Sequence, residues 1–445
     1  MAAVGSGGPA VRLDGRYAWA VVGVLMLAQS VSFIDRMIMG LLVGPVRKSF
    51  EISDTQYSLL AGFAFAVFYA VMGLPLGRMV DGGRRTRIVA VAMAFWSLMT
   101  ALCGLAWNFW SLFLARVGVG VGEAALSPAA YSIISDYFTK ARLARALSVY
   151  TVGVTIGSGL AYIVGGWVVG AADGMGQVVL PLVGAREGWQ LTFFLVGLPG
   201  LLLAPLVLMI REPPRRGVVD TETPSIRRTL AFMWARRDAY GPHILGMALF
   251  VMAVFSVNIW GPEYLIRTFG YGRAEAGQTF GVLMLVAGTS GLLLGGALAD
   301  RLVGRGVANG YNRVILGSMA CMTPCVALLW VAGTPAAGIA CIGAAVFFSA
   351  FQGGIGGGYI QLITPNRMRG QALAVYLLAT NLLGMGLGPT VVAAITDYGF
   401  GDDGALNRSL AVFGVVIIPL AALIMLAGLR RMTRALQDAR SWAEA

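Results

Sequence analysis

Long apolar runs recur along the chain and are separated by short polar segments. Each run has about 20 residues or more, enough for a helix rising 1.5 Å per residue to cross a hydrocarbon layer of about 30 Å. Of the 445 residues, 58% are hydrophobic and 12% are charged, whereas a soluble chain carries roughly 25% charged residues. We therefore predict an all-α membrane protein with twelve spans, near residues 17–45, 54–80, 86–107, 109–138, 144–170, 189–210, 240–267, 275–300, 312–332, 335–363, 370–396 and 409–429.

The longest polar interruption divides these runs into six and six. Pro213 and Pro214 stop the preceding helix, and the segment after Thr223 is expected to form a short amphipathic helix on the inner membrane surface. The predicted organisation is a cytoplasmic tail at 1–16, an N-terminal six-helix bundle at 17–210, a cytoplasmic linker at 211–239, a C-terminal six-helix bundle at 240–429 and a cytoplasmic tail at 430–445.

The two halves repeat short motifs at equivalent places. Residues 77–81 match 296–300 at an offset of 219, and residues 145–150 match 371–376 at an offset of 226. Glycines are also grouped in the fifth and eleventh spans, where they predict close helix packing or bends: Gly153, Gly157 and Gly159, then Gly384, Gly386 and Gly388. Repeated halves are typical of transporters, in which two similar bundles move about a central site.

The distribution of basic residues predicts the orientation. With the N-terminus inside, 25 Lys and Arg residues fall on the cytoplasmic side and six outside, so both termini are predicted to be cytoplasmic. The net charge of +12 then reflects topology and contact with anionic membrane lipid, and no nucleic-acid partner is expected. Arginine outnumbers lysine 31 to 2, a bias that we associate with a GC-rich bacterial genome and therefore with the bacterial inner membrane.

Two motifs in this chain resemble the signature sequence of the major facilitator superfamily. Gly77-x-x-x-Asp81-Gly-Gly-Arg84-Arg85 is similar to its cytoplasmic signature, with Gly82 where a basic residue is usual, and Gly296-x-x-x-Asp300-Arg301 is similar to the repeat of that signature. The resemblance covers almost the whole chain. It implies two six-helix bundles that work by alternating access.

Other motifs resemble the Spinster family of lysophospholipid and sphingosine-phosphate transporters. They are Phe33-Ile-Asp35-Arg36, Gly122-Glu123-Ala-Ala, Ile134-Ser-Asp136-Tyr-Phe and Gly153-x-x-x-Gly157-Ser-Gly159. This resemblance implies an amphipathic lipid substrate with an anionic or zwitterionic head. A drug/proton antiporter or an organic-anion carrier of the same superfamily remains an alternative, because it could use the same charged residues.

Four ionisable residues lie well inside the predicted spans: Asp35, Arg36, Arg116 and Glu123. Each costs about 2.5 to 3.5 kcal/mol at the bilayer centre on insertion scales, so such groups normally face a cavity or a partner. If the first and fourth spans face each other, as the superfamily resemblance implies, Arg36 can pair with Glu123. Asp35 then lies in a drier place that disfavours its charged form, and we expect it to carry the coupling proton.

Two other interpretations of these four residues remain open. They could form a static ion-pair network that holds the N-terminal bundle together. Alternatively, Arg36 or Arg116 could bind a phosphate or carboxylate head group directly. Protons are the expected coupling ion, and no cofactor or metal is expected.

The second half contains neutral polar groups where the first half has charges. We assign a substrate cavity to Asn258, Gln352, Asn381, Glu263 and Tyr376 of the second half, together with Tyr150 of the first half. An interhelical hydrogen bond is an equally good interpretation of each amide. Charges at the cytoplasmic ends of the spans are predicted to form a cytoplasmic gate, with a solvated fringe as the alternative: Asp81, Arg84, Arg85, Asp136, Arg145, Asp300 and Arg301.

Other functional classes fit less well. An ATP-driven pump needs a phosphate-binding loop with a lysine, and neither Lys48 nor Lys140 lies in one. Ser290 has the local sequence of a rhomboid protease, but the single histidine, His243, is predicted at a different depth. We therefore expect a transporter rather than an enzyme, acting as a monomer on a small-molecule or lysolipid substrate. A transporter-like sensor remains a remote alternative.

Overall fold

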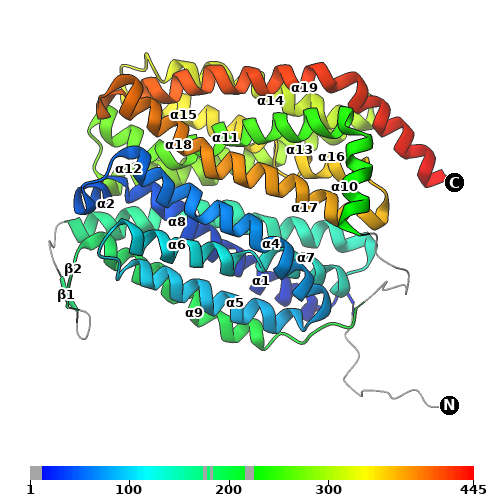
Figure 1. Ribbon diagram of the computed structural model, residues 1–445, viewed down its shortest axis with the longest axis horizontal. Coiled ribbons are helices and arrows are strands. Elements are labelled where there is room, and N and C mark those ends of the chain that lie inside the picture. The colour runs from blue at the N-terminus through cyan, green and yellow to red at the C-terminus, as the bar shows by residue number, and fades with distance from the viewer. Residues whose placement is uncertain (1–12, 174–177, 181–183, 216–224, 445) are drawn as a thin grey trace.

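The computed structural model describes residues 13–173, 178–180, 184–215 and 225–444, which form a bundle of long helices running side by side (Figure 1). Eleven helical stretches in this part of the chain are long and apolar enough to cross a membrane, and they coincide with eleven of the predicted spans. The other predicted span, 312–332, falls on α14 (Gly310–Leu328), whose first turn contains the polar Asn312 and Arg313. The predicted all-α membrane class is confirmed.

The N-terminal half occupies the lower part of Figure 1. Its elements are α1 (Arg16–Met37), η1 (Ile38–Leu41), α2 (Val43–Phe50), α3 (Asp54–Ser58), η2 (Leu59–Phe63), α4 (Ala64–Gly82), α5 (Arg85–Cys103), α6 (Phe109–Glu123), α7 (Leu126–Tyr137), α8 (Lys140–Asp173), β1 (Val178–Leu180), β2 (Gly184–Arg186) and α9 (Gly188–Leu208). The two short strands pair antiparallel, with Val179 opposite Ala185.

The C-terminal half occupies the upper part of the same view. It follows the linker helix α10 (Ile226–Ala235) and contains α11 (Arg237–Phe269), α12 (Arg273–Leu283), η3 (Met284–Gly288), α13 (Thr289–Gly304), α14, α15 (Pro335–Ala350), α16 (Ile355–Leu362), η4 (Asn366–Met368), α17 (Arg369–Ala379), η5 (Thr380–Met385), α18 (Gly386–Ala394), η6 (Ile395–Phe400), η7 (Asp403–Ala405) and α19 (Leu406–Glu444). Helix α10 lies within the segment predicted as a cytoplasmic linker.

The fourth span is interrupted directly after Glu123. Helix α6 ends there and α7 begins at Leu126. Pro128 explains the interruption, because proline has no N–H to donate to the carbonyl of Ala124, four residues earlier. The break places Glu123 at the last helical position of α6, facing the middle of the N-terminal half.

The predicted glycines show the relation between the halves. A Cβ atom on Gly157 of α8 would lie 2.8 Å from Ser30 Cα of α1, and one on Gly388 of α18 would lie 2.8 Å from Met252 Cα of α11. The same pair of helices is therefore brought together in each half by glycines that carry no side chain. Their close packing, predicted from the sequence, is confirmed at these positions.

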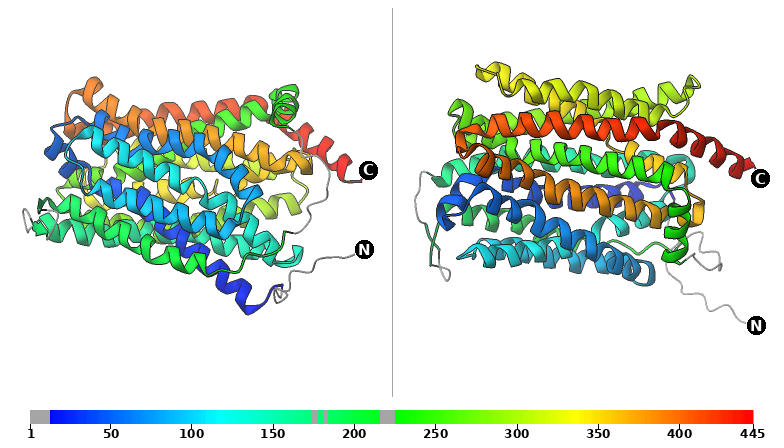
Figure 2. Two further views of the ribbon diagram at one scale, coloured as in Figure 1. Left: turned by 60° about the horizontal axis from the view of Figure 1, so that its bottom comes forward. Right: turned by 45° about the horizontal axis from the view of Figure 1, so that its top comes forward.

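The two ends of the molecule differ. Helix α10 and the C-terminal end of α19 lie at one end, and the β1–β2 hairpin lies at the other (Figures 1 and 2). The start of α1 is also at the α10 end, because the Arg211 N–H donates to the Tyr17 hydroxyl at 2.9 Å. Following the distribution of basic residues, we call these the cytoplasmic end and the outer end.

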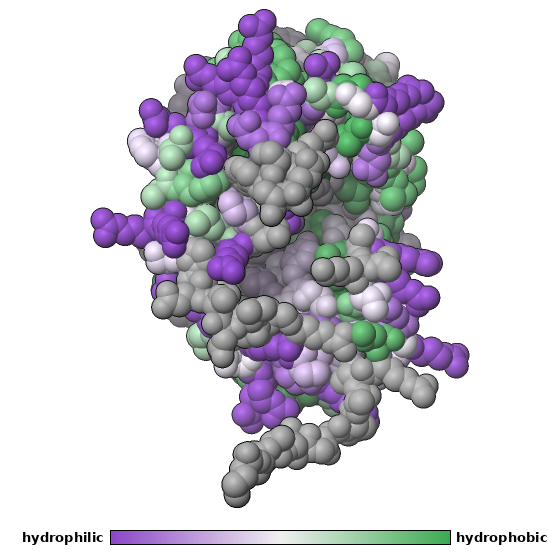
Figure 3. Space-filling view, turned by 90° about the vertical axis from the view of Figure 1, so that its right-hand side faces the viewer, coloured by the Kyte–Doolittle hydropathy of each residue, from purple (hydrophilic) through white to green (hydrophobic). Residues whose placement is uncertain are grey.

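Contacts between the halves are arranged unequally along the molecule. Near the outer end α12 packs on α8, and α18 packs on α3 and η2. Figure 3 views the cytoplasmic end and shows a recess near the middle of this face, with hydrophilic side chains gathered in several groups on the face around it. The halves therefore pack closely at the outer end, and the surface is hollowed at the cytoplasmic end.

Candidate functional site

The four charges predicted inside the spans are buried in the N-terminal half. Arg36, near the end of α1, donates through Nε to Oε2 of Glu123 on α6 at 2.7 Å. Ser32, one turn earlier on α1, donates to the same oxygen at 2.5 Å. The Arg36 side chain is 8% exposed and that of Glu123 is fully buried. The helix pair thus brings together the two residues that the sequence suggested as partners.

Aromatic rings surround the Arg36 guanidinium. Its central carbon lies 4.9 Å from the ring centre of Phe33, 4.7 Å from that of Phe65 and 4.6 Å from that of Tyr69. The negative faces of such rings attract a cation and replace part of its lost hydration. Arg36 is consequently stabilised by one carboxylate and three rings.

Asp35 has a different environment. Thr100 of α5 donates to Asp35 Oδ2 at 3.2 Å, and Arg116 Nη1 donates to the Asp35 backbone carbonyl at 3.1 Å. Asp35 Oδ1 and the Nε and Nη2 atoms of Arg116 are buried without a hydrogen-bond partner among the described residues. The arrangement leaves one carboxyl oxygen free to take a proton, beside a guanidinium that does not pair with it.

The residues assigned to a substrate cavity fall in three environments. The Tyr150 hydroxyl donates to Gln29 Oε1 at 2.6 Å in the N-terminal half. Tyr376 stacks on His243 in the C-terminal half, with ring centres 5.8 Å apart. Asn258 accepts the Tyr162 hydroxyl at its backbone carbonyl at 2.6 Å. The side chains of Asn258, Gln352 and Asn381 are half-buried.

Glu263 belongs to a set of charges at the outer end that the sequence did not suggest. It accepts from Arg267 Nε at 2.7 Å. Arg267 also donates both terminal nitrogens to Asp54, at 2.6 and 2.8 Å. Since Asp54 belongs to the N-terminal half and Arg267 to the C-terminal half, this pair connects the two bundles.

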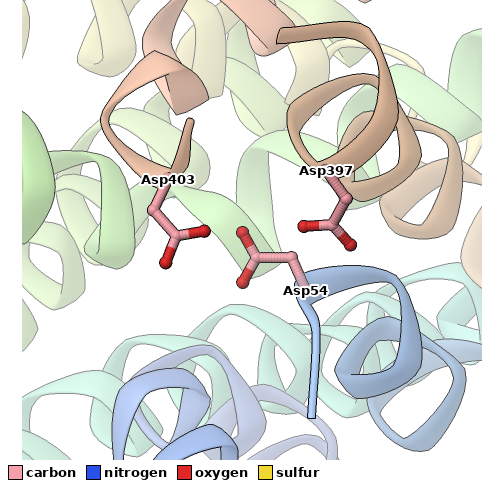
Figure 4. Close-up of side chains that lie close together, drawn as sticks. All are labelled: Asp54, Asp397 and Asp403. Carbon is pink, nitrogen blue, oxygen red and sulfur yellow. The ribbon is translucent and has the colours of Figure 1, made fainter. Parts of the chain in front are cut away.

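A second arginine completes the connection. Arg47 lies 2.9 Å from Asp54 and 2.9 Å from Asp403, and Asp397 accepts the backbone N–H of Thr55 at 2.7 Å. Figure 4 shows the three aspartates converging from both halves. We call the set formed by Arg47, Asp54, Glu263, Arg267, Asp397 and Asp403 the outer ion-pair network.

These three carboxylates are also close enough together to be considered as ligands of a metal ion. Oxygens of Asp54, Asp397 and Asp403 lie within 4.8 Å of one another. Both oxygens of Asp54, however, already accept from guanidinium groups of Arg47 and Arg267. The chemistry of this cluster is therefore that of ion pairing across the halves. The sequence indicated these ion pairs only indirectly, because Arg47 and Arg267 are among the six basic residues that it assigns to the outer side.

The predicted cytoplasmic gate residues divide into a buried and an exposed set. Arg85 forms ion pairs with Asp136 of α7 and with Glu212, 2.6 Å away after α9. Arg84, Arg145, Asp300 and Arg301 are exposed, and among the described residues none of them forms a salt bridge. The side chain of Asp81 lies outside the described residues.

Glu212 was not predicted as a site residue. Its carboxylate accepts the Thr86 N–H at 2.9 Å and the Thr86 hydroxyl at 3.0 Å, in addition to Arg85. Partial burial acts to raise the pKa of Glu212, but the hydrogen bonds from Thr86 and Arg85 outweigh it and hold that pKa below its usual value. The linker therefore begins on a fixed, charged contact with α5.

His243 is the second residue that sequence analysis did not assign. It is fully buried on α11, with Nδ1 at 2.9 Å from Asn312 Oδ1 and Nε2 at 2.8 Å from the Gly356 carbonyl. It thereby links α11 to α14 and α16. The signal available in the sequence was that this is the chain's only histidine.

Comparison with known proteins identifies the family. A profile of the Major Facilitator Superfamily matches residues 25–389. The chain belongs to this superfamily. An MFS-type efflux pump of Mycolicibacterium smegmatis is 30% identical over 412 residues, 89% of either chain. Protein spinster of Drosophila melanogaster is 27% identical over 65% of this chain and 47% of its own length.

Solved structures agree with that assignment. A bacterial homologue of the human lysosomal transporter Spinster, in an inward-facing and unoccupied conformation, superimposes with a TM-score of 0.76 at 25% identity, covering 96% of this chain and 98% of the other. A D-xylose-proton symporter has a TM-score of 0.66 at 18% identity and supports the fold alone. The expected resemblance to Spinster transporters is confirmed, and the chain is an integral membrane transporter of this superfamily rather than an enzyme.

Proposed function

We propose that this transporter is driven by protons and that Asp35 carries them. The observation that supports the proposal is an asymmetry within one buried cluster. Asp35 and Glu123 each have one oxygen without a hydrogen-bond partner among the described residues. Glu123, however, forms an ion pair with Arg36 and accepts from Ser32 through its other oxygen, whereas no ion pair of Asp35 is found in the described part of the chain. A carboxyl group that can exist in either protonation state inside a membrane is suited to coupling. No cofactor or metal is part of the proposal.

The proposed mechanism uses the change in charge of Asp35. Ionised Asp35 needs water or a cation, and Arg116 is within reach through its two unpartnered nitrogens. Protonation removes that requirement and leaves Arg36 and Glu123 as a neutral pair. A conformation that excludes water from Asp35 costs more free energy when Asp35 is ionised than when it is protonated. Binding of the proton therefore shifts the equilibrium between the inward-open and outward-open states.

We propose an amphipathic lysolipid or sphingoid-phosphate-like substrate. The guanidinium of Arg36, set among three aromatic rings, suits a molecule with an anionic group and an apolar body. The sequence relatives include a zebrafish sphingosine-1-phosphate transporter, 25% identical over 63% of this chain and 56% of its own length. We expect the protein to act as a monomer.

Drug/proton antiport is the second candidate function. It is favoured by the match to the mycobacterial efflux pump, which spans more of both chains than the match to spinster proteins. Organic-anion transport has weaker support from a probable L-galactonate transporter of Escherichia coli, 24% identical over 78% of this chain. A sensor that binds without transport is excluded if radiolabelled substrate exchanges across the membrane.

The coupling role of Asp35 is tested by Asp35→Asn in proteoliposomes. We expect the variant to lose accumulation driven by a pH gradient while retaining substrate counterflow, which needs no net proton movement. Asp238→Asn, the same chemical change at the exposed start of α11, is the matched control and should behave as wild type. Full, pH-driven accumulation by Asp35→Asn would remove Asp35 from coupling.

The substrate class is tested separately by binding to the purified protein. Lysophosphatidylcholine, sphingosine phosphate and a hydrophobic cation are compared by thermal stabilisation. Stabilisation by the two phosphate-bearing lipids and not by the cation supports the lipid proposal. Stabilisation by the cation alone supports the antiporter.

A further inference from the structure

Helices α14 and α19 pack against each other and leave a hollow at each end of their shared groove. At the cytoplasmic end a cavity of about 420 Å³ is lined by Arg313, Leu429, Arg430, Thr433 and Arg434. Nearer the outer end a cavity of about 510 Å³ is lined by apolar side chains: Ala327, Trp330, Val331, Ala411, Val412, Val415 and Val416. Neither hollow belongs to the proposed transport site.

The two hollows lie on one side of α19. Each of its residues in the outer hollow recurs 18 positions later in the cytoplasmic hollow, so that Val412 corresponds to Arg430 and Val416 to Arg434. Eighteen residues are five full turns at 3.6 residues per turn, which returns to the same direction. Leu423, 63% exposed, lies between them within about 20° of the Arg430 direction. The two hollows therefore face the same side of the helix pair, with a basic hollow at the cytoplasmic end, an apolar hollow nearer the outer end and the exposed Leu423 between them.

The basic end contains three guanidinium groups from two helices. Arg313 comes from the first turn of α14, and Arg430 and Arg434 are one turn apart on α19. Among the described residues, none of these arginines forms a salt bridge. Three such groups, converging on one hollow without a carboxylate in its lining, match the geometry and charge of a phosphate group.

We propose that this groove binds an anionic glycerophospholipid of the cytoplasmic leaflet. The lipid phosphate contacts Arg313, Arg430 and Arg434, and an acyl chain follows the groove past Leu423 towards the outer hollow. A basic pocket between spans at the cytoplasmic surface is the setting in which anionic head groups bind. The exposed Leu423 and the apolar outer hollow on the same side of α19 favour a lipid over free phosphate, because phosphate alone would leave these apolar surfaces uncovered.

Binding to this groove would brace the C-terminal half from outside. Helix α19 packs on both α14 and α11, and α11 carries Arg267 of the outer ion-pair network. A lipid that bridges α14 and α19 therefore stabilises the bundle on which the network depends. The proposal is independent of the transported substrate.

The test measures lipid binding to the purified full-length transporter in a neutral detergent. Native mass spectrometry is used to count bound phosphatidylglycerol, with phosphatidylcholine, which is zwitterionic and has no net charge, as the comparison. We expect preferential binding of phosphatidylglycerol, and Arg430→Gln to weaken it about fivefold, the loss expected for one arginine near an anionic head group. Arg431→Gln, an equal loss of charge at the adjacent exposed position outside the groove, is the control and should bind as wild type.

Further arms separate the possible outcomes. Arg313→Gln, on the other helix, should weaken binding as Arg430→Gln does, which keeps the test valid if one variant fails to fold. An excess of inorganic phosphate should not displace the lipid. Equal weakening by Arg431→Gln would reduce the effect to general surface charge. Equal binding of the two lipids, or displacement by phosphate, would also overturn the proposal.

Discussion

Asp54 of the N-terminal half receives both terminal nitrogens of Arg267 from the C-terminal half, at 2.6 and 2.8 Å. The Asp54 side chain is fully buried and that of Arg267 is 10% exposed, so the pair is shielded from water and has the two-pronged geometry that makes such contacts strong. An outward-open state requires the two halves to separate here. The pair therefore stabilises the arrangement seen in the structure, in which the outer end is closed.

Asp54→Asn should shift the transporter towards the outward-open state. Breaking a buried pair by removing one charge costs about 3–5 kcal/mol, and this cost falls on the closed outer end. Asn258→Cys provides the measurement. The backbone carbonyl of Asn258 accepts from the Tyr162 hydroxyl across the contact between the halves, so a membrane-impermeant maleimide added outside should reach this position only when the outer end opens. We expect at least tenfold faster labelling in the Asp54→Asn background.

The matched control for this prediction is Asp403→Asn. Its side chain is 58% exposed, and exposed ion pairs contribute about 0–1 kcal/mol. Labelling should rise far less than in Asp54→Asn. Unchanged labelling in Asp54→Asn would show that the outer ion-pair network does not hold this end closed.

Glu123→Leu should destabilise the protein more than the double change Arg36→Met with Glu123→Leu. The single variant leaves the Arg36 guanidinium buried without its carboxylate, at a cost of about 3–5 kcal/mol, whereas the double variant removes both charges. Thermal unfolding in detergent provides the measurement. If the double variant is destabilised by the sum of the two single changes, Arg36 and Glu123 do not act as a pair.

The sequence was informative about these buried charges for a physical reason. A charge within an apolar run has few ways to be tolerated, so Asp35, Arg36, Arg116 and Glu123 stood out at once. The membrane spans could also be predicted from the sequence, because each one must be a long apolar segment on its own. The division into two halves could be predicted because short motifs recur at equivalent places in each half. The close-packed glycines could be predicted because they are grouped in the corresponding fifth and eleventh spans.

The outer ion-pair network could not be predicted in the same way. Asp54 and Arg267 are 213 residues apart and lie where polar residues are expected, at the ends of spans. Their pairing depends on how the two bundles are placed, which no local pattern records. Glu212 was similarly hidden beside Pro213, where the prolines drew attention to the end of a helix rather than to the carboxylate before them.

Gly157→Ala should destabilise the packing of α8 on α1. The added methyl group would lie 2.8 Å from Ser30 Cα and 3.0 Å from Phe33 Cβ, and such overpacking typically costs about 1–3 kcal/mol. Gly73→Ala is the control, because no atom lies within 4 Å of a Cβ built there and alanine favours a helix over glycine by about 1 kcal/mol. Opposite shifts in the thermal midpoint are expected, and a neutral Gly157→Ala would contradict the close approach.

Glu212→Gln should reduce stability at neutral pH and have little effect in acid. Because the pKa of Glu212 is lowered in the folded protein, its carboxylate contributes stability above the unfolded value of about 4.3 and loses that contribution as the pH falls through the folded pKa. Hydrogen bonds to a charged group contribute about 1.5–3 kcal/mol, and partial exposure of this side chain places the expected loss near the lower figure. Thermal midpoints of wild type and variant should therefore differ at pH 7 and approach each other at an acid pH below the unfolded value. Glu51→Gln, at an exposed position of the outer loop, is the control and should show no such difference. If the difference in thermal midpoint between wild type and Glu212→Gln is the same at both pH values, the side chain acts through its shape rather than its charge.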